Sequence, residues 1–249
     1  MDLLAALAPT LLALAILMVL TTAVLWVSRT PSFRAPVSAI LRGAAQLAII
    51  SLILGGIITD PFWVALGLLV MFTVAAVTAT RRLTWSWPRF GMVAATMGAG
   101  IAVTLAVVFA TGAIQFEPRY VLAVAGIVIG NCMSIAVLAG HRFFGAVRDQ
   151  WDQVEGWLAL GATARQATLS QSRHAVRAAL IPSTDQTKTT GLVTLPGAFV
   201  GAIFGGASPL EAGRFQVVVL AAIMAAGAIT AVALVRSLAA VKVRPGVIR

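Results

Sequence analysis

Long apolar runs alternate with short polar stretches along the whole chain. A helix needs about 20 residues to cross roughly 30 Å of hydrocarbon at about 1.5 Å per residue, and it satisfies its backbone hydrogen bonds within one segment. Seven runs are candidate spans: residues 3–26, 37–58, 62–77, 90–111, 120–139, 190–204 and 215–238. The third and sixth runs are the shortest, so either is open to being tilted, broken or re-entrant, and six spans are the alternative.

The composition places the chain outside the class of water-soluble enzymes, because 60% of its residues are hydrophobic and only 10% are charged. A membrane β-barrel is excluded as well, since its strands alternate apolar and polar residues over short segments. The fold class that remains is all-α: a polytopic helical membrane protein with about seven transmembrane helices. The single cysteine, Cys132, excludes an intrachain disulfide.

The net charge of +10 reflects where the basic residues lie along the chain. The eighteen Lys and Arg residues are dispersed between the apolar runs, so we expect no nucleic-acid partner. They fall mainly in alternate connections, beginning with Arg29 and Arg34 and continuing with Arg81, Arg82 and residues 142–188. Because basic connections face the cytoplasm, the chain is predicted to lie in the cell (inner) membrane with its N-terminus outside and its C-terminus inside.

One connection is much longer than the others. Residues 140–189 are predicted to leave the membrane for about fifty residues, and loops of that length usually carry function or secondary structure of their own. The spacing predicts a cytoplasmic helix that ends at Leu160 and is stopped by Gly161, followed by a second helix that Thr163 caps. Two roles are open: an amphipathic pair on the membrane surface, or a docking element for a soluble partner.

Several ordered segments resemble a known family. Glu155, followed six residues later by Gly161, resembles the EAA-type coupling loop of ABC-transporter permeases, with Gly156 and Trp157 in place of its two alanines. Three longer segments are similar to the FetB-type family of ABC permeases, the bacterial iron-export permeases related to plant aluminium-tolerance permeases: LGATARQA (160–167), RAALIP (177–182) and GLVTLPG (191–197). The same pattern also includes Ala125, Gly126, Gly130, Asn131 and Met133, with Arg42 and Gln46 in the second run.

The resemblance implies that residues 1–249 form a single transmembrane permease domain of an ATP-driven ABC exporter, with 140–189 as the cytoplasmic coupling loop between spans five and six. It also implies a homodimer of permeases, a separate ABC ATP-binding subunit, and a metal ion, iron, as the substrate. After Gly197 the family has two methionines where this chain has Ala198 and Phe199, so two thioether groups that suit a soft metal are absent.

The residues themselves also place ATP hydrolysis on a separate subunit. The sequence contains no glycine-rich phosphate-binding loop that ends in Lys-Ser or Lys-Thr, so ATP and Mg are expected on the partner subunit. This chain is accordingly not expected to be an enzyme, to hold a cofactor or to have catalytic residues. The expected ATPase-coupling residues are Glu155, Trp157, Leu158, Gly161, Ala162, Thr163 and Arg165.

Polar residues within the spans are few, and they are candidates for the translocation path. The predicted path residues are Gln46, Asn131, Met133, Ser134 and Thr194. The alternative is that Gln46, Asn131 and Ser134 hydrogen-bond across helix interfaces. One Met and one Cys form no recognised site, so we expect no fixed metal centre.

A glycine repeat follows a proline in the sixth run. Gly197, Gly201 and Gly205 recur every four residues, which leaves one side of the helix without side chains, and Pro196 permits a hinge. Two interpretations are open: tight packing inside one subunit, or a helix at the two-fold axis of a homodimer or beside the path.

Other functions remain open. They are an ion-coupled secondary transporter without an ATPase partner, an ABC permease for a nucleotide sugar or other small solute, and a membrane scaffold that transports nothing. Proton-coupled carriers keep carboxylates or histidines inside their spans. Here all eight acidic residues are expected in loops or at span ends, and His141 and His174 on the cytoplasmic side, which disfavours the carrier.

Overall fold

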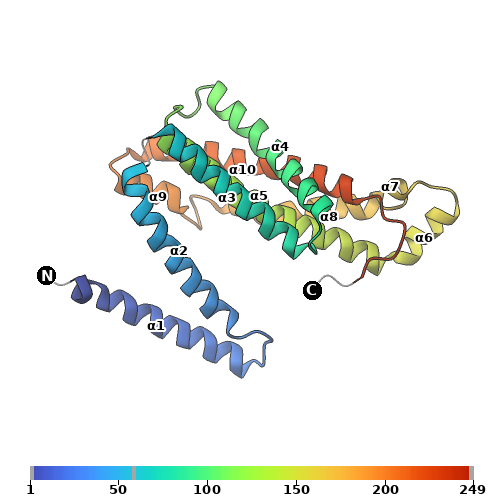
Figure 1. Ribbon diagram of the computed structural model, residues 1–249, viewed down its shortest axis with the longest axis horizontal. Coiled ribbons are helices and arrows are strands. Elements are labelled where there is room, and N and C mark those ends of the chain that lie inside the picture. The colour runs from blue at the N-terminus through green and yellow to red at the C-terminus, as the bar shows by residue number, and fades with distance from the viewer. Residues whose placement is uncertain (1–2, 58–59, 247–249) are drawn as a thin grey trace. The chain divides into compact units, whose positions relative to one another are not determined.

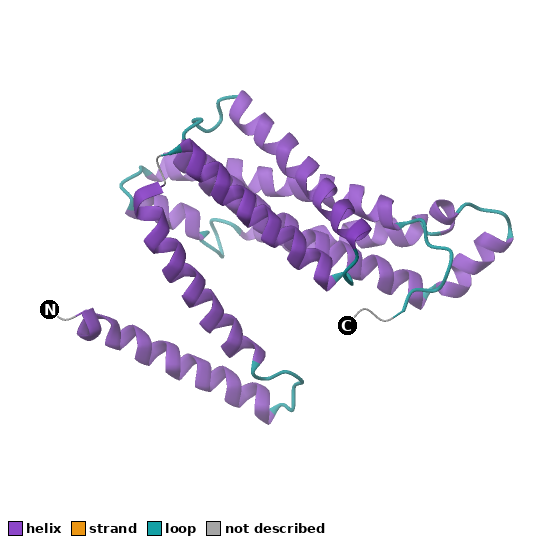
Figure 2. Cartoon of the chain, in the orientation of Figure 1, coloured by secondary structure: helices purple, strands orange, loops and turns teal. Residues whose placement is uncertain are grey.

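The computed structural model describes residues 3–57 and 60–246, with side chains described for residues 8–51 and 60–246. Its helices are α1 (Leu3–Val27), α2 (Ala35–Ile57), α3 (Pro61–Arg82), α4 (Trp87–Ala110), α5 (Pro118–Asp149), α6 (Trp151–Ala159), α7 (Ala164–Ala167), α8 (Leu169–Thr189), α9 (Gly197–Phe204) and α10 (Pro209–Leu238) (Figure 1). Apart from an isolated bridge between Thr190 and Thr194, this described part contains no strand (Figure 2). The all-α prediction is therefore confirmed, while Ile58, the predicted end of the second span, lies outside the described residues.

Met1–Ile57 form one compact unit, in which a short turn joins α1 to α2. None of the described side chains of α1 is buried within the chain. Its apolar residues, such as Leu12 and Val19, are 63% and 69% exposed. Apolar side chains exposed along a whole helix are what a lipid environment requires.

Ile58–Arg249 form the second unit, a helix bundle with α5 at its centre. α5 packs against α3, α4, α8 and α10, and α10 also packs against α4, α8 and α9 (Figure 1). Val128 and Phe143 on α5, Met97 on α4 and Leu234 on α10 are fully buried and fill the core. The outer faces of α3 and α4 are apolar and exposed, so these faces of the bundle suit contact with lipid.

Helix starts in the bundle follow local capping signals. Asp60 accepts a hydrogen bond from the amide of Phe62 at 2.9 Å, and Pro61 occupies the first position of α3. Ser208 and Glu211 form a reciprocal capping box at the start of α10. These caps satisfy amide groups that have no partner within the helix, so the chain sequence fixes both boundaries locally.

Among the residues that the structure describes, five helices are long and apolar enough to cross a membrane: α1 over Ala8–Val27, α3, α4, α5 and α10. α2 contains a shorter apolar stretch, Ala35–Ser51. The chain is a multi-pass membrane protein, as predicted. α5 is longer than predicted, because it continues past residue 139 to Asp149 with Phe143 and Val147 still buried.

The predicted sixth span, residues 190–204, is not one continuous helix. After α8 the amide of Gly191 donates to the carbonyl of Thr194 at 2.8 Å, and α9 begins only at Gly197. α9 has eight residues; at about 1.5 Å per residue this is roughly 12 Å, which is too short to cross the hydrocarbon. The break has two causes: the φ of +89° at Gly191 lies outside the helical region, and Pro196 has no amide to donate. The shortness of this run therefore does reflect a broken element.

Three arginines that the charge pattern places on the cytoplasmic side lie at one end of the bundle. Arg89 Cζ lies 5.9 Å from the centre of the Phe144 ring, and the Arg244 side chain donates to the carbonyl of Arg148 at 3.3 Å. We call this the basic end. At the opposite end, residues of the α4–α5 loop, Arg119 and the first turns of α10 line a shared cavity.

Candidate translocation surface and coupling helices

α6 and α7 form a compact corner at the basic end. α6 ends at Ala159 with Leu160 as its C-cap, and Gly161 follows with a φ of +87°. The Thr163 hydroxyl accepts a hydrogen bond from the amide of Gln166 at 3.4 Å, and Gln166 Oε1 accepts one from the amide of Thr163 at 2.9 Å. The predicted order of helix, glycine turn and capped helix is confirmed.

The corner is anchored through the inner face of α6. Val154 is fully buried, and Trp151 and Leu158 pack against the core. Gln171 of α8, which is 1% exposed, donates from Nε2 to Gln150 Oε1 at 2.9 Å beside the start of α6. The predicted coupling residues that are exposed are Glu155, Trp157, Gly161, Thr163 and Arg165, while Leu158 and Ala162 are half-buried. The structure therefore brings the predicted coupling residues together at one corner.

Replacing Thr163 with alanine removes the cap of α7, because no side-chain oxygen is left to accept from the amide of Gln166. We expect a local loss of about 1 kcal/mol, measured as roughly fivefold faster hydrogen exchange of the α7 amides. Thr187→Ala is the matched control, since that hydroxyl donates within α8 to the carbonyl of Ser183 and caps nothing. Unchanged exchange in the Thr163 variant would show that the cap contributes nothing to α7.

The two polar candidates on α5 bond to their own helix. Asn131 Nδ2 donates to the carbonyl of Ile127 at 2.9 Å, and Ser134 Oγ donates to the carbonyl of Gly130 at 3.2 Å. Within the described chain neither side chain hydrogen-bonds to another helix, because each bonds to the carbonyl four residues back in its own helix. Ser134 is exposed and Asn131 is half-buried, so both remain candidates for the path.

The other path candidates lie elsewhere. Met133 packs against the hydrophobic core of the bundle. Thr194 is exposed in the turn between α8 and α9. Gln46 is exposed on α2, which belongs to the other unit. The structure thus groups Asn131 with Ser134 and separates Met133 from them.

The glycine repeat on α9 makes no close helix contact among the described residues. A Cβ atom placed on Gly197 or Gly201 meets no neighbouring atom within 4 Å, and one on Gly205 meets only its own segment. Tight packing inside one subunit is therefore not the role of this repeat in the described chain. Close approach occurs instead at Gly100 of α4, where a Cβ atom would lie 2.6 Å from the carbonyl oxygen of Ala226 on α10.

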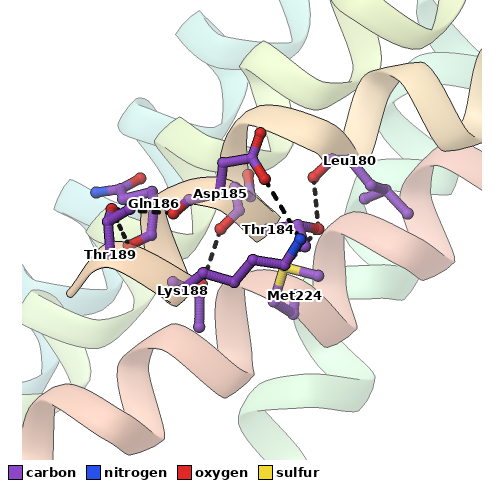
Figure 3. A network of polar contacts seen from close by, with 9 residues as sticks. Leu180, Thr184, Asp185, Gln186, Lys188, Thr189 and Met224 are labelled. Carbon is purple, nitrogen blue, oxygen red and sulfur yellow. Dashed lines mark hydrogen bonds and ion pairs between the residues drawn. The ribbon is translucent and has the colours of Figure 1, made fainter.

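α8 runs antiparallel to the second half of α10. Thr168 Oγ1 donates to the carbonyl of Ala239 at 3.0 Å, and Thr184 Oγ1 donates to Met224 Sδ at 4.0 Å (Figure 3). Met224 is near the middle of α10, so the next residue of α8, Asp185, is also at mid-length of that span. Asp185, expected in a loop or at a span end, thus lies within α8 and level with the middle of α10.

One face of α8 is exposed and mostly polar from His174 to Lys188. We define the α8 stripe as His174, Arg177, Ile181, Asp185 and Lys188, which recur at helical spacing and are all exposed. The buried face of the helix contains Ala175, Ala179 and Ser183 and packs on the bundle. Lys188 Nζ lies 3.5 Å from Asp185 Oδ1, and the two side chains are 69% and 61% exposed (Figure 3).

A cavity between α5 and α8 lies at the basic end of the α8 stripe. Its lining includes His141 and Arg142 of α5 and His174 of α8. Ser134 lies seven residues before His141 and so shares its face of α5. The exposed polar positions of α5 and the α8 stripe therefore border the same side of the bundle. Within residues 60–246 and 8–51, no three His, Cys, Asp or Glu side chains come together as a metal centre requires.

Comparisons with known proteins bear on the whole of this architecture. A family model described as the uncharacterised protein family UPF0014 matches residues 9–241. The chain is 41% identical over 197 residues to the UPF0014 membrane protein STAR2 of Oryza sativa subsp. japonica, across 78% of this chain and 69% of that protein. It is 35% identical over 224 residues to the protein ALUMINUM SENSITIVE 3 of Arabidopsis thaliana, across 88% and 82%. It is 42% identical over 127 residues to the probable iron export permease protein FetB of Escherichia coli (strain K12), across 51% and 48%. No solved structure matches the chain.

Proposed function

Because the chain belongs to the UPF0014 family, we propose that it is the permease subunit of an ATP-driven ABC exporter that works with a separate ATP-binding subunit. The relatives favour transport over catalysis, since one of them is named a permease. The observation that carries the proposal is the α6–α7 corner, a rigid, exposed element anchored in the bundle. A partner that moves this corner also moves the spans to which it is attached.

The corner has the chemistry of a docking element. Trp157 is 53% exposed and borders a pocket that Gln153 and Arg173 also line. Exposed aromatic and Arg side chains next to a pocket are typical anchors of protein interfaces. Glu155 adds a charge that pairs with a basic residue of the ATP-binding subunit, while the buried Val154 on the inner face transmits the displacement to the core of the bundle.

The sidedness of the bundle agrees with a partner in the cytoplasm. Arg89, Arg148 and Arg244 lie at the same end as the α6–α7 corner, and basic residues favour the cytoplasmic face of a membrane. The permease then lies in the inner membrane with its N-terminus outside and its C-terminus inside. Two copies form the path, because two ATP-binding subunits require two such corners and homo-oligomers are usually two-fold.

The substrate that the relatives favour is a metal ion, since the Escherichia coli relative is named a probable iron export permease. The FetB-type family that the chain resembles has two methionines where this chain has Ala198 and Phe199, so in this proposal the metal is held by oxygen ligands and water rather than by thioethers. ATP and Mg bind to the partner subunit, and no metal is resident in this chain.

A second function is favoured by one observation. Asp185 on α8, level with the middle of the α10 span, is the kind of ionisable group that ion-coupled carriers use. An ion-coupled carrier transports without ATP and stops when the ion gradient is dissipated. The ABC permease instead requires the ATP-binding subunit and is insensitive to that gradient.

Co-purification tests the first proposal. Tagged permease is expected to bring down a subunit that contains a phosphate-binding loop, and Gly161→Arg is expected to reduce the amount recovered at least tenfold. The larger side chain occupies the exposed corner, and residues with a side chain rarely adopt a φ of +87°. Glu155→Lys is expected to weaken the complex by reversing a charge at the same surface.

Gln115→Lys is the matched control, because it adds a charge to an exposed residue of the α4–α5 loop at the opposite end of the bundle. It should leave the complex intact. If all three variants recover equal amounts of ATP-binding subunit, or if none is recovered with the unaltered permease, the coupling proposal fails.

A further inference from the structure

We infer that the α8 stripe lines a water-filled path through the membrane and that the Asp185 carboxylate, paired with Lys188 when the path is empty, binds the transported cation. The inference deepens the proposed function by naming a surface and a group that contacts the substrate. It rests on the depth of α8, on the charge of its exposed face, and on the geometry of one ion pair.

The depth of α8 follows from its register with α10. Thr168 meets Ala239 and Thr184 meets Met224, so each step forward along α8 corresponds to one step back along α10. The same register places Asp185 level with Ile223. Leu180 agrees with this register, because a Cβ atom built on Gly227 of α10 would lie 3.6 Å from Leu180 Cδ2.

The uncharged stretch of α10 indicates where this helix crosses the hydrocarbon layer. Between Arg214 and Arg236 no residue is charged over about 21 positions, which is roughly 31 Å at about 1.5 Å per residue and matches the thickness of a bilayer core. The midpoint of this stretch is Ala225. Asp185, level with Ile223, therefore lies within about one helical turn of the centre of the membrane.

The exposed face of α8 is too polar for lipid at this depth. Arg177, Asp185 and Lys188 are all level with the charge-free part of α10, and charged side chains in a span almost always face protein or water. The outer face of α3 is the contrast, because Leu69, Val70 and Val74 are apolar and more than half exposed. The bundle therefore has one face for lipid and a different face, along α8, for water.

The ion pair between Asp185 and Lys188 indicates that the site at mid-depth prefers cations. Asp185 is the single acidic residue of α8, and its carboxylate lies 3.5 Å from Lys188 Nζ on the same face. An unpaired carboxylate at this depth is unfavourable, so the ammonium group balances it when no ion is bound. A carboxylate oxygen is also a ligand for hard cations. A passing cation takes the place of Lys188, and the pair re-forms when the cation leaves.

Cysteine labelling tests the water-filled face without any partner subunit. In full-length permease reconstituted in vesicles with Cys132 replaced by alanine, Ile181→Cys on the stripe is expected to react at least tenfold faster with a charged methanethiosulfonate than Val70→Cys. These two residues are a matched pair, since they are 48% and 55% exposed and both are apolar. Equal, slow reaction of the two cysteines would overturn the assignment of α8 to the path.

Manganese binding tests Asp185. Electron paramagnetic resonance of Mn²⁺ added to the purified permease is expected to show a site that Asp185→Asn weakens at least tenfold. Lys188→Gln is expected to tighten the same site several-fold, because the competing ammonium is removed. Asp152→Asn, an exposed carboxylate on α6, is the control and should change nothing.

The outcomes separate this inference from the proposed function. Absence of a Mn²⁺ site in the unaltered permease, or equal binding in the Asp185 variant, overturns the cation assignment even if an ATP-binding subunit co-purifies. Labelling of Ile181→Cys together with loss of Mn²⁺ binding in Asp185→Asn supports the inference even if no such subunit is found.

Discussion

Gly100→Leu is expected to abolish the folded bundle. A Cβ atom at this position would lie 2.6 Å from the carbonyl oxygen of Ala226 and 2.6 Å from Thr230 Oγ1, and the carbonyl belongs to the backbone of α10 and cannot rotate away. α4 and α10 must then separate, which opens the core around Met97 and Ile223. We expect a destabilisation of about 3 kcal/mol or more. Thermal unfolding and size-exclusion chromatography in detergent measure it as loss of monodisperse protein.

Gly91→Leu is the matched control for this experiment. Gly91 lies on the same helix, and a Cβ atom there meets no other atom within 4 Å. The same substitution in the same helix should therefore leave the yield and the unfolding temperature nearly unchanged. Normal yield and stability of Gly100→Leu would mean that α4 and α10 do not approach as closely as described.

Val154→Asp is expected to release the α6–α7 corner from the bundle while the spans remain inserted. The Val154 side chain is fully buried, and an unpaired carboxylate in that position costs about 3 kcal/mol or more. α6 has nine residues and cannot hold its helix without tertiary contacts. Trypsin cleavage after Arg148 and Arg165 should become roughly a hundredfold faster, because cleavage follows the population of the open form.

The control is Leu160→Asp, which places the same carboxylate on the same corner at a side chain that is 81% exposed. Its cleavage rate should stay close to that of the unaltered chain. In the proposed complex, Val154→Asp should also lose ATP-dependent transport, since an undocked corner transmits no movement. Slow cleavage of Val154→Asp would show that α6 is held by contacts other than its inner face.

Much of the local structure is predictable because its causes lie close together in the sequence. Thr163 and Gln166 are three residues apart and close a capping box wherever the rest of the chain lies. Gly161 reaches a positive φ because it has no side chain, and the apolar runs become helices because lipid offers the backbone no other partner. These features predicted the membrane class, five of the spans and the helix-turn-helix order of the α6–α7 corner.

The packing glycines were not predictable in the same way. The repeat of Gly197 and Gly201 is visible in the sequence, yet no described residue packs against it. Gly100 and Gly227 belong to no glycine repeat of four-residue spacing, but each lies where a second helix crosses. Which glycine allows a close approach depends on the partner helix, and the partner is chosen by tertiary packing.

The sequence by itself determined that this chain crosses a membrane as helices, where its basic residues lie, and how α6 and α7 are capped. The tertiary structure decided that the stretch around Asp185 and Lys188 lies beside α10 at mid-length rather than in an open loop. Polar residues at helical spacing look the same whether the helix lies in solvent or beside a path. Only a contact between distant segments, such as Thr184 with Met224, fixes the depth of a helix, and no local pattern specifies such a contact.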